Sequence, residues 1–333
     1  MSRMNSADGS GEAMVIVGAG LTGATAAATL RSEGYTGPIV LIGAEQDIPY
    51  LRPPLSKGFL TGKETEESLL PYPQSWYGDN DVRLITDETA ARTDPADHSV
   101  TLTSGHSLRY SKLLLSTGAV PRILELPGTE LEGVQYFRTK ADSRQLRTQL
   151  AKGGRRLVII GSGWIGMEVA ASARELGNEV TLLGLEEVPL SAAIGRQPGS
   201  VFVSRQLEAG VQFRLPASAD RLNADDDGHV SAVVVSTGEI LPADLVVIAV
   251  GVVPNIALAE TAGLKISNGI QVDSGLRTSS VDIFAAGDVA NVLHPVTGEY
   301  ARSEHWANAL AGGEVAAKSM LGHDAVLDAI PYF

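Results

Sequence analysis

Short apolar runs alternate with glycine-rich turns and helical segments along most of the chain. The first run, at 14–17, leads into three glycines, and a segment of small residues at 24–30 follows. A second apolar run at 39–42 ends close to Glu45. Apolar runs of this length bounded by turn residues are typical of buried strands, and the segment between them has helical character. The pattern predicts strand, turn, helix and strand, with an acid after the second strand.

The same pattern returns in the middle of the chain. Residues 157–160 are apolar, a second set of three glycines begins at Gly161, and a helix is predicted over 167–176 before an apolar run at 180–183. Gly161 follows Gly18 by 143 positions. A repeat at this distance indicates two domains of one kind rather than a short solenoid. We call 14–45 the first cradle and the second copy, which begins at 157, the second cradle.

Each glycine set has the G-x-G-x-x-G spacing of a dinucleotide site. In the first cradle, Gly18 permits a tight turn, Gly20 lets the backbone approach a pyrophosphate, and Gly23 lets the helix lie close to the sheet. The helix N-terminus offers N–H groups to the diphosphate, and Glu45 can accept hydrogen bonds from a ribose. The spacing alone also occurs in structural turns. The flanking strands and helix make a nucleotide site the favoured interpretation. The second cradle has the same glycines at Gly161, Gly163 and Gly166.

A proline-rich segment follows the first cradle. In Y-L-R-P-P-L-S-K, at 50–57, two adjacent prolines predict a stiff extended connection that no helix occupies. Arg52 and Lys57 would then be held beside the first cradle. A surface turn with solvated cations is the alternative, but an anionic cofactor nearby favours a binding role.

Between the cradles, several short strands are expected over 82–120. The buried run at 113–115 closes in the turn at Thr117 and Gly118, which is small enough to pack against a cofactor, although such turns are common.

After the second cradle, a buried strand at 245–250 precedes the turn 251–255. Asp288 follows an apolar strand and precedes an expected helix start, where it could cap the helix or bind a cofactor hydroxyl. A last helix is expected from Arg302 to about Met320.

The length, charge and composition of the chain argue against several classes of function. The chain has 333 residues, which favours two domains, and a net charge of −13, which argues against nucleic acid as a partner. It contains no cysteine, so it has no disulfide, thiolate metal site or C-x-x-C relay. The six histidines show no ligand spacing, so no metal site is expected. A polar leader at 1–13 and apolar runs too short to span a bilayer lead us to expect a cytoplasmic protein without a membrane partner.

Taken together, the two glycine sets, R-P-P-L-S-K, S-T-G, G-V-V-P-N and I-F-A-A-G-D-V-A resemble the FAD-dependent ferredoxin reductases of oxygenase systems. These form the putidaredoxin reductase, rubredoxin reductase and biphenyl-dioxygenase reductase group. The resemblance runs from about Met14 to Phe333. It implies an α/β fold with two Rossmann-like dinucleotide-binding domains in three layers, as in glutathione-reductase-like flavoproteins. The implied domains are 12–122 and 248–325 for FAD, 123–247 for NADH, and 326–333 as the start of a truncated C-terminal domain.

The resemblance also implies roles for individual residues. FAD would lie on the first cradle, with Arg52 on its pyrophosphate and Asp288 on its ribityl chain. Lys57 would lie near the flavin N5 edge, ion-paired with Glu168, and these two are the expected catalytic residues. Trp164 would stand at the nicotinamide entry of the NADH site. The full set of expected cofactor-binding residues is Gly18, Gly20, Gly23, Glu45, Arg52, Lys57, Thr117, Gly118, Arg122, Gly287, Asp288, Glu304, His305 and Trp306 for FAD, with Gly161, Gly163, Trp164, Gly166, Glu186 and Gly251 for NADH.

Two positions keep alternatives open. Glu168 lies in the first turn of a predicted helix. Its purely structural role there would be to complement the helix dipole, which would contribute under ~1 kcal/mol to stability. The favoured role of Glu168 is an ion pair with Lys57 in a cleft that is partly shielded from water. At the end of the second cradle, Gly184 replaces the acid that relatives often have, while Glu186 and Glu187 follow. Since these carboxylates would repel a 2′-phosphate, NADH is expected rather than NADPH.

The expected function is therefore hydride transfer from NADH to FAD and single-electron transfer to a ferredoxin-type iron–sulfur partner, with a homodimer possible. A disulfide reductase would need a redox cysteine. A quinone reductase would need a membrane-seeking segment, which the sequence does not show. A flavoprotein that senses NADH without turnover, or an incomplete fragment, is the remaining alternative.

Overall fold

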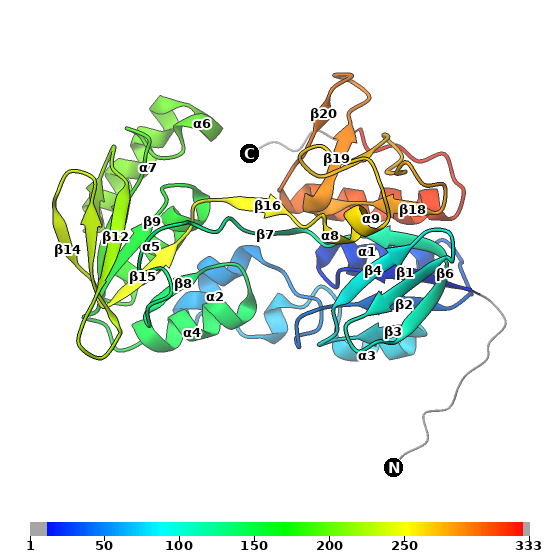
Figure 1. Cartoon of the computed structure of the whole chain (residues 1–333), viewed down its shortest axis with the longest axis horizontal. Coiled ribbons are helices and arrows are strands. Elements are labelled where there is room, and N and C mark those ends of the chain that lie inside the picture. The colour runs from blue at the N-terminus through cyan, green and yellow to red at the C-terminus, as the bar shows by residue number, and fades with distance from the viewer. Residues whose placement is uncertain (1–11, 329–333) are drawn as a thin grey trace, which may run out of the picture. The chain divides into compact units, whose positions relative to one another are not determined.

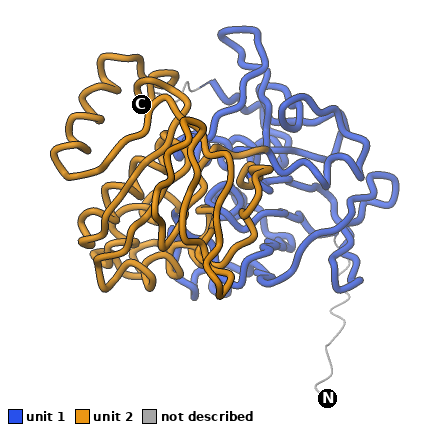
Figure 2. The backbone as a smooth tube through the Cα atoms, turned by 60° about the vertical axis from the view of Figure 1, so that its left-hand side comes forward, with its two compact units in different colours: residues 1–51, 70–119, 254–333 blue, residues 52–69, 120–253 orange. Residues whose placement is uncertain are grey.

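The computed structural model describes residues 12–328, so the predicted leader and the terminal I-P-Y-F lie mostly or wholly outside the described residues. The chain divides into two compact units (Figure 2). Unit 1 comprises 1–51, 70–119 and 254–333, and unit 2 comprises 52–69 and 120–253. The grouping of 52–69 with the central segment was not anticipated from the sequence, and the predicted domain limits stay a prediction.

Unit 1 is built on a parallel sheet whose central strand carries the first cradle. The strand order is β3-β2-β1-β6-β18, and β5 and β4 extend the sheet in the antiparallel sense from β6. The strands are β1 (Ala13–Val17), β2 (Ile39–Ile42), β3 (Val82–Ile85), β4 (Ala90–Asp94), β5 (Ser99–Leu102), β6 (Ser107–Leu115) and β18 (Ile283–Ala285).

Helices and a small second sheet complete unit 1 (Figure 1). Small residues on α1 allow α9 to pack closely against it, and both contribute alanines to the core. The remaining elements are α1 (Leu21–Ser32), α3 (Gln74–Asp79), α8 (Ala257–Thr261), η3 (Gly287–Val289), α9 (Trp306–Met320), β17 (Ile270–Val272), β19 (Ala290–Leu293) and β20 (Tyr300–Ala301).

Unit 2 repeats this plan around the second cradle. Its parallel sheet has the order β11-β10-β9-β15-β8, and an antiparallel sheet β12-β13-β14 follows β11 in the chain. The strands are β8 (Val134–Tyr136), β9 (Arg156–Ile160), β10 (Glu179–Leu183), β11 (Gln212–Arg214), β12 (Ala219–Ala224), β13 (Val230–Val235), β14 (Ile240–Pro242) and β15 (Leu245–Ile248).

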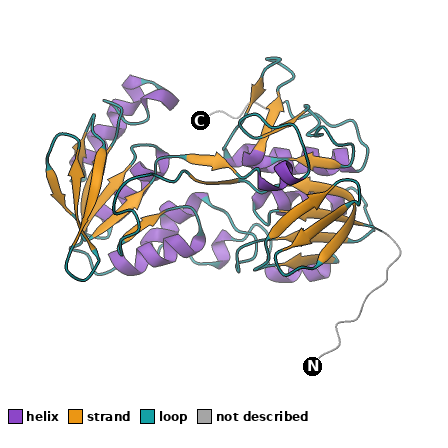
Figure 3. Ribbon diagram, viewed as in Figure 1, coloured by secondary structure: helices purple, strands orange, loops and turns teal. Residues whose placement is uncertain are grey.

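The helices of unit 2 come from both of its segments. Figure 3 distinguishes the helices of the chain from its strands by colour. Two strands, β7 (Ala119–Pro121) and β16 (Val252–Pro254), pair where the chain passes from one unit to the other. The helical elements are η1 (Pro53–Ser56), α2 (Gly58–Thr61), η2 (Glu67–Leu69), α4 (Lys140–Leu150), α5 (Trp164–Glu175), α6 (Ser191–Ile194) and α7 (Arg196–Glu208).

Three local predictions were wrong. Residues 53–56 form the single 3-10 turn η1 rather than an extended segment, because prolines at the first positions of a helix need no N–H donor. Asp288 lies inside the short turn η3, and a strand follows it instead of a helix. The last helix begins at Trp306 and not at Arg302, since His305 has extended backbone and its Nδ1 accepts a hydrogen bond from Ala307 N–H at 3.1 Å.

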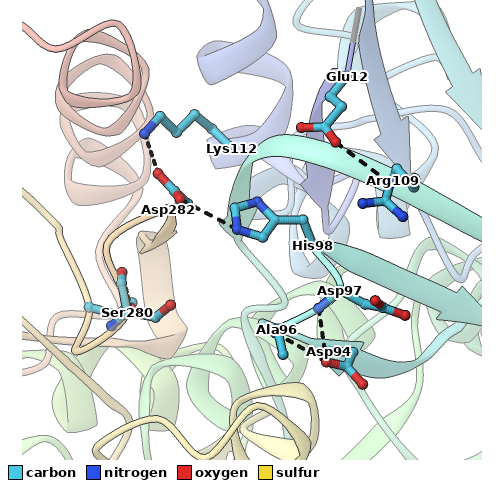
Figure 4. Close-up of polar contacts among 10 residues, drawn as sticks. Glu12, Asp94, Ala96, Asp97, His98, Arg109, Lys112, Ser280 and Asp282 are labelled. Carbon is cyan, nitrogen blue, oxygen red and sulfur yellow. Dashed lines mark hydrogen bonds and ion pairs between the residues drawn. The ribbon is translucent and has the colours of Figure 1, made fainter.

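Charged residues gather at the amino ends of the strands of unit 1 (Figure 4). Asp282, which directly precedes β18, pairs with Lys112 of β6 and lies 3.7 Å from His98 Nε2. Nearby, Arg109 pairs with Glu12 at 3.6 Å. Cofactors bind at the carboxyl ends of strands in open α/β sheets, so this cluster marks the opposite end from the candidate site.

Candidate functional site

The first glycine loop follows the carboxyl end of β1. Gly18 has φ of 115°, and a Cβ there would stand 2.0 Å from the Ser116 carbonyl oxygen. A Cβ at Gly23 would stand 2.1 Å from the carbonyl oxygen of Gly18. Gly20 is different, because nothing lies within 4 Å of where its Cβ would be. Two of the glycines are therefore required by the protein's own packing, and the third faces open space.

The second glycine loop has the same three environments. A Cβ at Gly161, where φ is 118°, would meet Ala249 O at 2.2 Å, and one at Gly166 would meet Gly161 O at 2.0 Å. Gly163 again faces open space. The packing roles predicted for the outer glycines agree with this geometry. The open middle position at the start of each helix fits the approach of a dinucleotide pyrophosphate.

The acid of the first cradle lies just beyond β2. Glu45 is half-buried, and its Oε2 accepts a hydrogen bond of 2.6 Å from the Tyr50 hydroxyl. Its carboxylate is thus oriented by the protein, and its expected role in binding a ribose stays a prediction.

The turn at Thr117 and Gly118 lies at the end of β6 in unit 1. The Thr117 hydroxyl donates to Asn255 O at 2.7 Å, and Asn255 N–H donates to Gly118 O at 2.9 Å. The G-V-V-P-N segment thus pairs with this turn, a contact that joins residues 138 positions apart.

The Asp288 turn packs against the start of α1. A Cβ at Gly287 would stand 2.6 Å from Thr22 Oγ1, and one at Gly313 of α9 would stand 2.6 Å from Thr22 O. Asp288 is half-buried in this turn, and its carbonyl accepts a bond of 3.1 Å from Arg302 Nη1. Asp288 is therefore brought to the same end of unit 1 as the first glycine loop.

The segment before α9 also lies in unit 1. Glu304 pairs with the largely buried Arg302 at 2.6 Å, and His305 caps α9. Trp306, the first residue of the helix, is 46% exposed. These residues are ordered by contacts within unit 1, and the flavin contacts assigned to them stay a prediction.

Lys57 and Glu168 are brought together in unit 2, 2.8 Å apart from Nζ to Oε2. The prediction that these two residues pair agrees with the geometry. Lys57 Nζ also donates to Pro53 O at 2.8 Å. Glu168 lies one turn into α5 with its side chain 26% exposed, whereas that of Lys57 is 49% exposed, so the carboxylate is the better shielded partner.

A third residue, Ser56, joins this ion pair, and the sequence did not predict it. The Ser56 hydroxyl donates to the same Glu168 Oε2 at 2.5 Å, and Ser56 is buried. The carbonyl of Ser56 in turn accepts a bond of 2.6 Å from the Ser172 hydroxyl, one turn further along α5. Ser56 therefore fixes the 53–57 segment on one face of α5. No local signal in the sequence indicates this, because the partners lie 112 and 116 positions away.

Further contacts anchor 52–69 on α4. The buried Ser143 hydroxyl donates to Leu55 O at 2.6 Å, and Arg144 pairs with Glu66 at 2.5 Å. The hydrogen bonds from Arg144 hold the pKa of Glu66 below its ordinary value. Arg52, expected on the FAD pyrophosphate, donates through Nη1 to Arg138 O at 2.6 Å.

A groove with a volume of about 520 Å³ runs along the exposed face of α5. It is lined by residues of α2, α5 and α7, with Lys57 and Glu168 among them. Trp164, the first residue of α5, packs edge-on against Phe202 of α7, with ring centroids 5.9 Å apart. The expected place of Trp164 at a nicotinamide entry stays a prediction.

The remaining expected residues of unit 2 lie on loops. Arg122 and Gly251 meet through a backbone hydrogen bond of 2.9 Å, and Gly251 has φ of 97°. Glu186 follows β10 in the loop that also holds Gly184. Among residues 12–328, no group of three or more acidic or histidine side chains is arranged to hold a metal ion.

If the chain catalyses the flavin reduction by NADH that its motifs imply, Ser56→Ala should lower the rate constant of that step about fivefold. The hydrogen bond of a hydroxyl to a carboxylate contributes about 1.5–3 kcal/mol, and only part of this orients the pair. Anaerobic stopped-flow absorbance measures this rate constant.

The matched control is Ser172→Ala. It removes another hydroxyl that holds the same segment, through Ser56 O, but leaves Glu168 untouched. We expect S172A to lower stability and to keep the reduction rate. Equal losses of rate in both variants would contradict a positioning role for Ser56.

Comparisons with known proteins agree with this geometry. The family described as pyridine nucleotide-disulphide oxidoreductase matches residues 12–313. Rhodocoxin reductase of Rhodococcus erythropolis is 37% identical over 320 residues, covering 96% of this chain and 74% of the relative. A rubredoxin–NAD(+) reductase of Pseudomonas putida is 39% identical, covering 93% of this chain and 80% of the relative.

Solved structures show the same similarity. A chain in the covalent putidaredoxin reductase–putidaredoxin complex matches with a TM-score of 0.93 and 34% identity, over 97% of this chain and 78% of that one. The ferredoxin reductase of the CYP199A2 system from Rhodopseudomonas palustris matches with a TM-score of 0.92 and 36% identity, over 96% and 79%. These similarities confirm the resemblance inferred from the motifs and the predicted glutathione-reductase-like α/β fold.

Proposed function

This chain belongs to the pyridine nucleotide-disulphide oxidoreductase family, and we propose that it is an NADH-dependent, FAD-containing reductase of a small iron–sulfur or rubredoxin-type electron carrier. The observation that carries this proposal is the presence of two glycine cradles with the same open middle position in one chain that contains no cysteine. One cradle serves FAD and the other NADH. Without a cysteine, no residue of this chain passes electrons through a disulfide.

When bound, FAD would supply the chemistry of accepting a hydride and of releasing its two electrons singly to a one-electron acceptor. The protein's part is binding and orientation. In unit 1, the loop at Gly20 admits the diphosphate of FAD, while Glu45, held by Tyr50, accepts from its ribose. In unit 2, Gly163 admits the diphosphate of NADH. Lys57, held by Glu168 and Pro53 O, would supply a fixed positive charge that stabilises negative charge on a bound cofactor.

Relatives support the identity of the partner. They include rhodocoxin reductase, rubredoxin–NAD(+) reductase and the ferredoxin–NAD(+) reductase component of an anthranilate 1,2-dioxygenase system. We propose a carrier of the same type for this chain. None of the helices within residues 12–328 combines the length and apolar character needed to cross a bilayer. It stays a prediction that the protein prefers NADH to NADPH, that it forms a homodimer and that it is located in the cytoplasm.

The absorbance spectrum of FAD-reconstituted protein before and after anaerobic NADH tests the proposal. We expect flavin absorbance that NADH bleaches, followed by cytochrome c reduction that depends on added ferredoxin. Bleaching without ferredoxin-dependent turnover would instead favour an NADH-responsive flavoprotein. Failure to retain FAD would contradict the assignment of the first cradle.

A further inference from the structure

The loops that follow the second strand of each cradle are built alike. Gly43 directly follows β2, and a Cβ there would stand 2.6 Å from the Ala19 Cβ in the first glycine loop. Gly184 directly follows β10, and a Cβ there would stand 2.2 Å from Ser162 Oγ in the second glycine loop. Both positions press against the pyrophosphate-binding loop. An acid therefore does not fit at residue 184 unless Ser162 moves.

The acid in each loop lies two residues further on. Glu45 and Glu186 are both half-buried. Each accepts a hydrogen bond from a hydroxyl five residues later, at 2.6 Å from Tyr50 and 3.1 Å from Ser191. Glu186 is thus the counterpart of the acid that we assign to the ribose of FAD.

An arginine outside the second loop pairs with an acid inside it. Arg196 begins α7, and its Nη2 lies 2.8 Å from Oε2 of Glu187. Both side chains are exposed, at 69% and 66%. Glu187 adjoins Glu186, so the guanidinium is tied to the same loop as the candidate ribose acid.

We propose that Glu186, oriented by Ser191, binds the adenosine ribose of the pyridine nucleotide, and that Glu187 disfavours NADPH by occupying Arg196, which would otherwise bind a 2′-phosphate. This rests on the proposed function only in that the second cradle binds a pyridine nucleotide. An acid accepts hydrogen bonds from a ribose 2′-hydroxyl and repels a 2′-phosphate, whereas a nearby arginine accommodates the phosphate. Because the Glu187–Arg196 pair is exposed, it is weak. Its contribution to the discrimination between NADH and NADPH is therefore modest.

The test compares the binding of AMP and adenosine 2′,5′-bisphosphate to the FAD-loaded protein by titration calorimetry. Glu187→Gln should raise the affinity for the bisphosphate about fivefold, because it frees Arg196 from an exposed ion pair, and should leave the AMP affinity unchanged. Adding Arg196→Gln to this variant should abolish the gain. Glu186→Gln should lower the AMP affinity about tenfold, since a hydrogen bond to a charged group is lost.

Glu208→Gln is the matched control. Glu208 pairs with Arg205 at 3.0 Å at the other end of α7, with similar exposure, and its replacement should change neither affinity. An equal gain in E187Q and E208Q, or a gain in E187Q that survives R196Q, would overturn the proposal. A chain that binds neither nucleotide would instead contradict the proposed function, so the two failures are distinguishable.

Discussion

Alanine at Gly23 is expected to destabilise unit 1 severely, whereas alanine at Gly20 is expected to preserve the fold and weaken FAD binding. The added Cβ of G23A would lie 2.1 Å from Gly18 O and 3.1 Å from Leu41 Cδ1. Backbone must then shift, and overpacking of this kind costs about 1–3 kcal/mol or more. The higher helix propensity of alanine recovers at most about 1 kcal/mol. Thermal unfolding of the apoprotein measures the stability, and flavin retained per chain measures the binding.

Gly20 has an allowed backbone conformation for alanine, with φ of −88°, and its Cβ would meet no protein atom within 4 Å. The methyl group of G20A would instead occupy the space we assign to the FAD pyrophosphate. The second cradle offers the matched pair. G166A should destabilise unit 2, while G163A should keep the flavin and raise the KM for NADH. Similar melting temperatures for G20A and G23A would contradict the separation of packing and binding glycines.

Replacing Lys57 with methionine is expected to lower the rate constant for flavin reduction by NADH about 10²-fold, which is the usual effect of removing one group that stabilises developing charge. Methionine keeps much of the aliphatic volume, so the flavin content should not change. The carboxylate of Glu168 would be left with Ser56 as its hydrogen-bond donor in this cluster. Anaerobic stopped-flow reduction over a range of NADH concentrations separates the rate constant from nucleotide affinity.

The ion pair of Lys63 and Glu175 supplies the control. Their atoms lie 2.5 Å apart on the same groove, and Glu175 lies two turns beyond Glu168 on α5. K63M removes a similar charge from a more exposed pair, and we expect flavin reduction to stay within about twofold of the parent because exposed pairs contribute little. Equal losses in K57M and K63M would show that general electrostatics, and not the Lys57 position, governs the rate.

Local signals explain why so much of the cradles could be predicted. A strand of four or five apolar residues, a G-x-G-x-x-G turn and a helix lie within about thirty residues of each other. The strands β1, β2, β9 and β10 and the helices α1 and α5 accordingly appear where the patterns placed them, within a few residues at the ends. The wrong predictions at 53–56, at Asp288 and at Arg302 concern single turns and helix starts, which depend on one or two backbone hydrogen bonds.

The amino-acid sequence by itself determined that this protein has two glycine cradles and no cysteine relay. The Lys57–Glu168 pair was expected only from the resemblance to known reductases, and no pattern along the chain indicates it. The tertiary structure alone decided that Ser56 joins that pair and that residue 184 is closed against Ser162. It also decided that Glu187 holds Arg196. The glycine motifs are local because they need only neighbouring residues to form. Hydrogen bonds between residues more than a hundred positions apart depend instead on how η1 packs on α5, and no pattern along the chain records that packing.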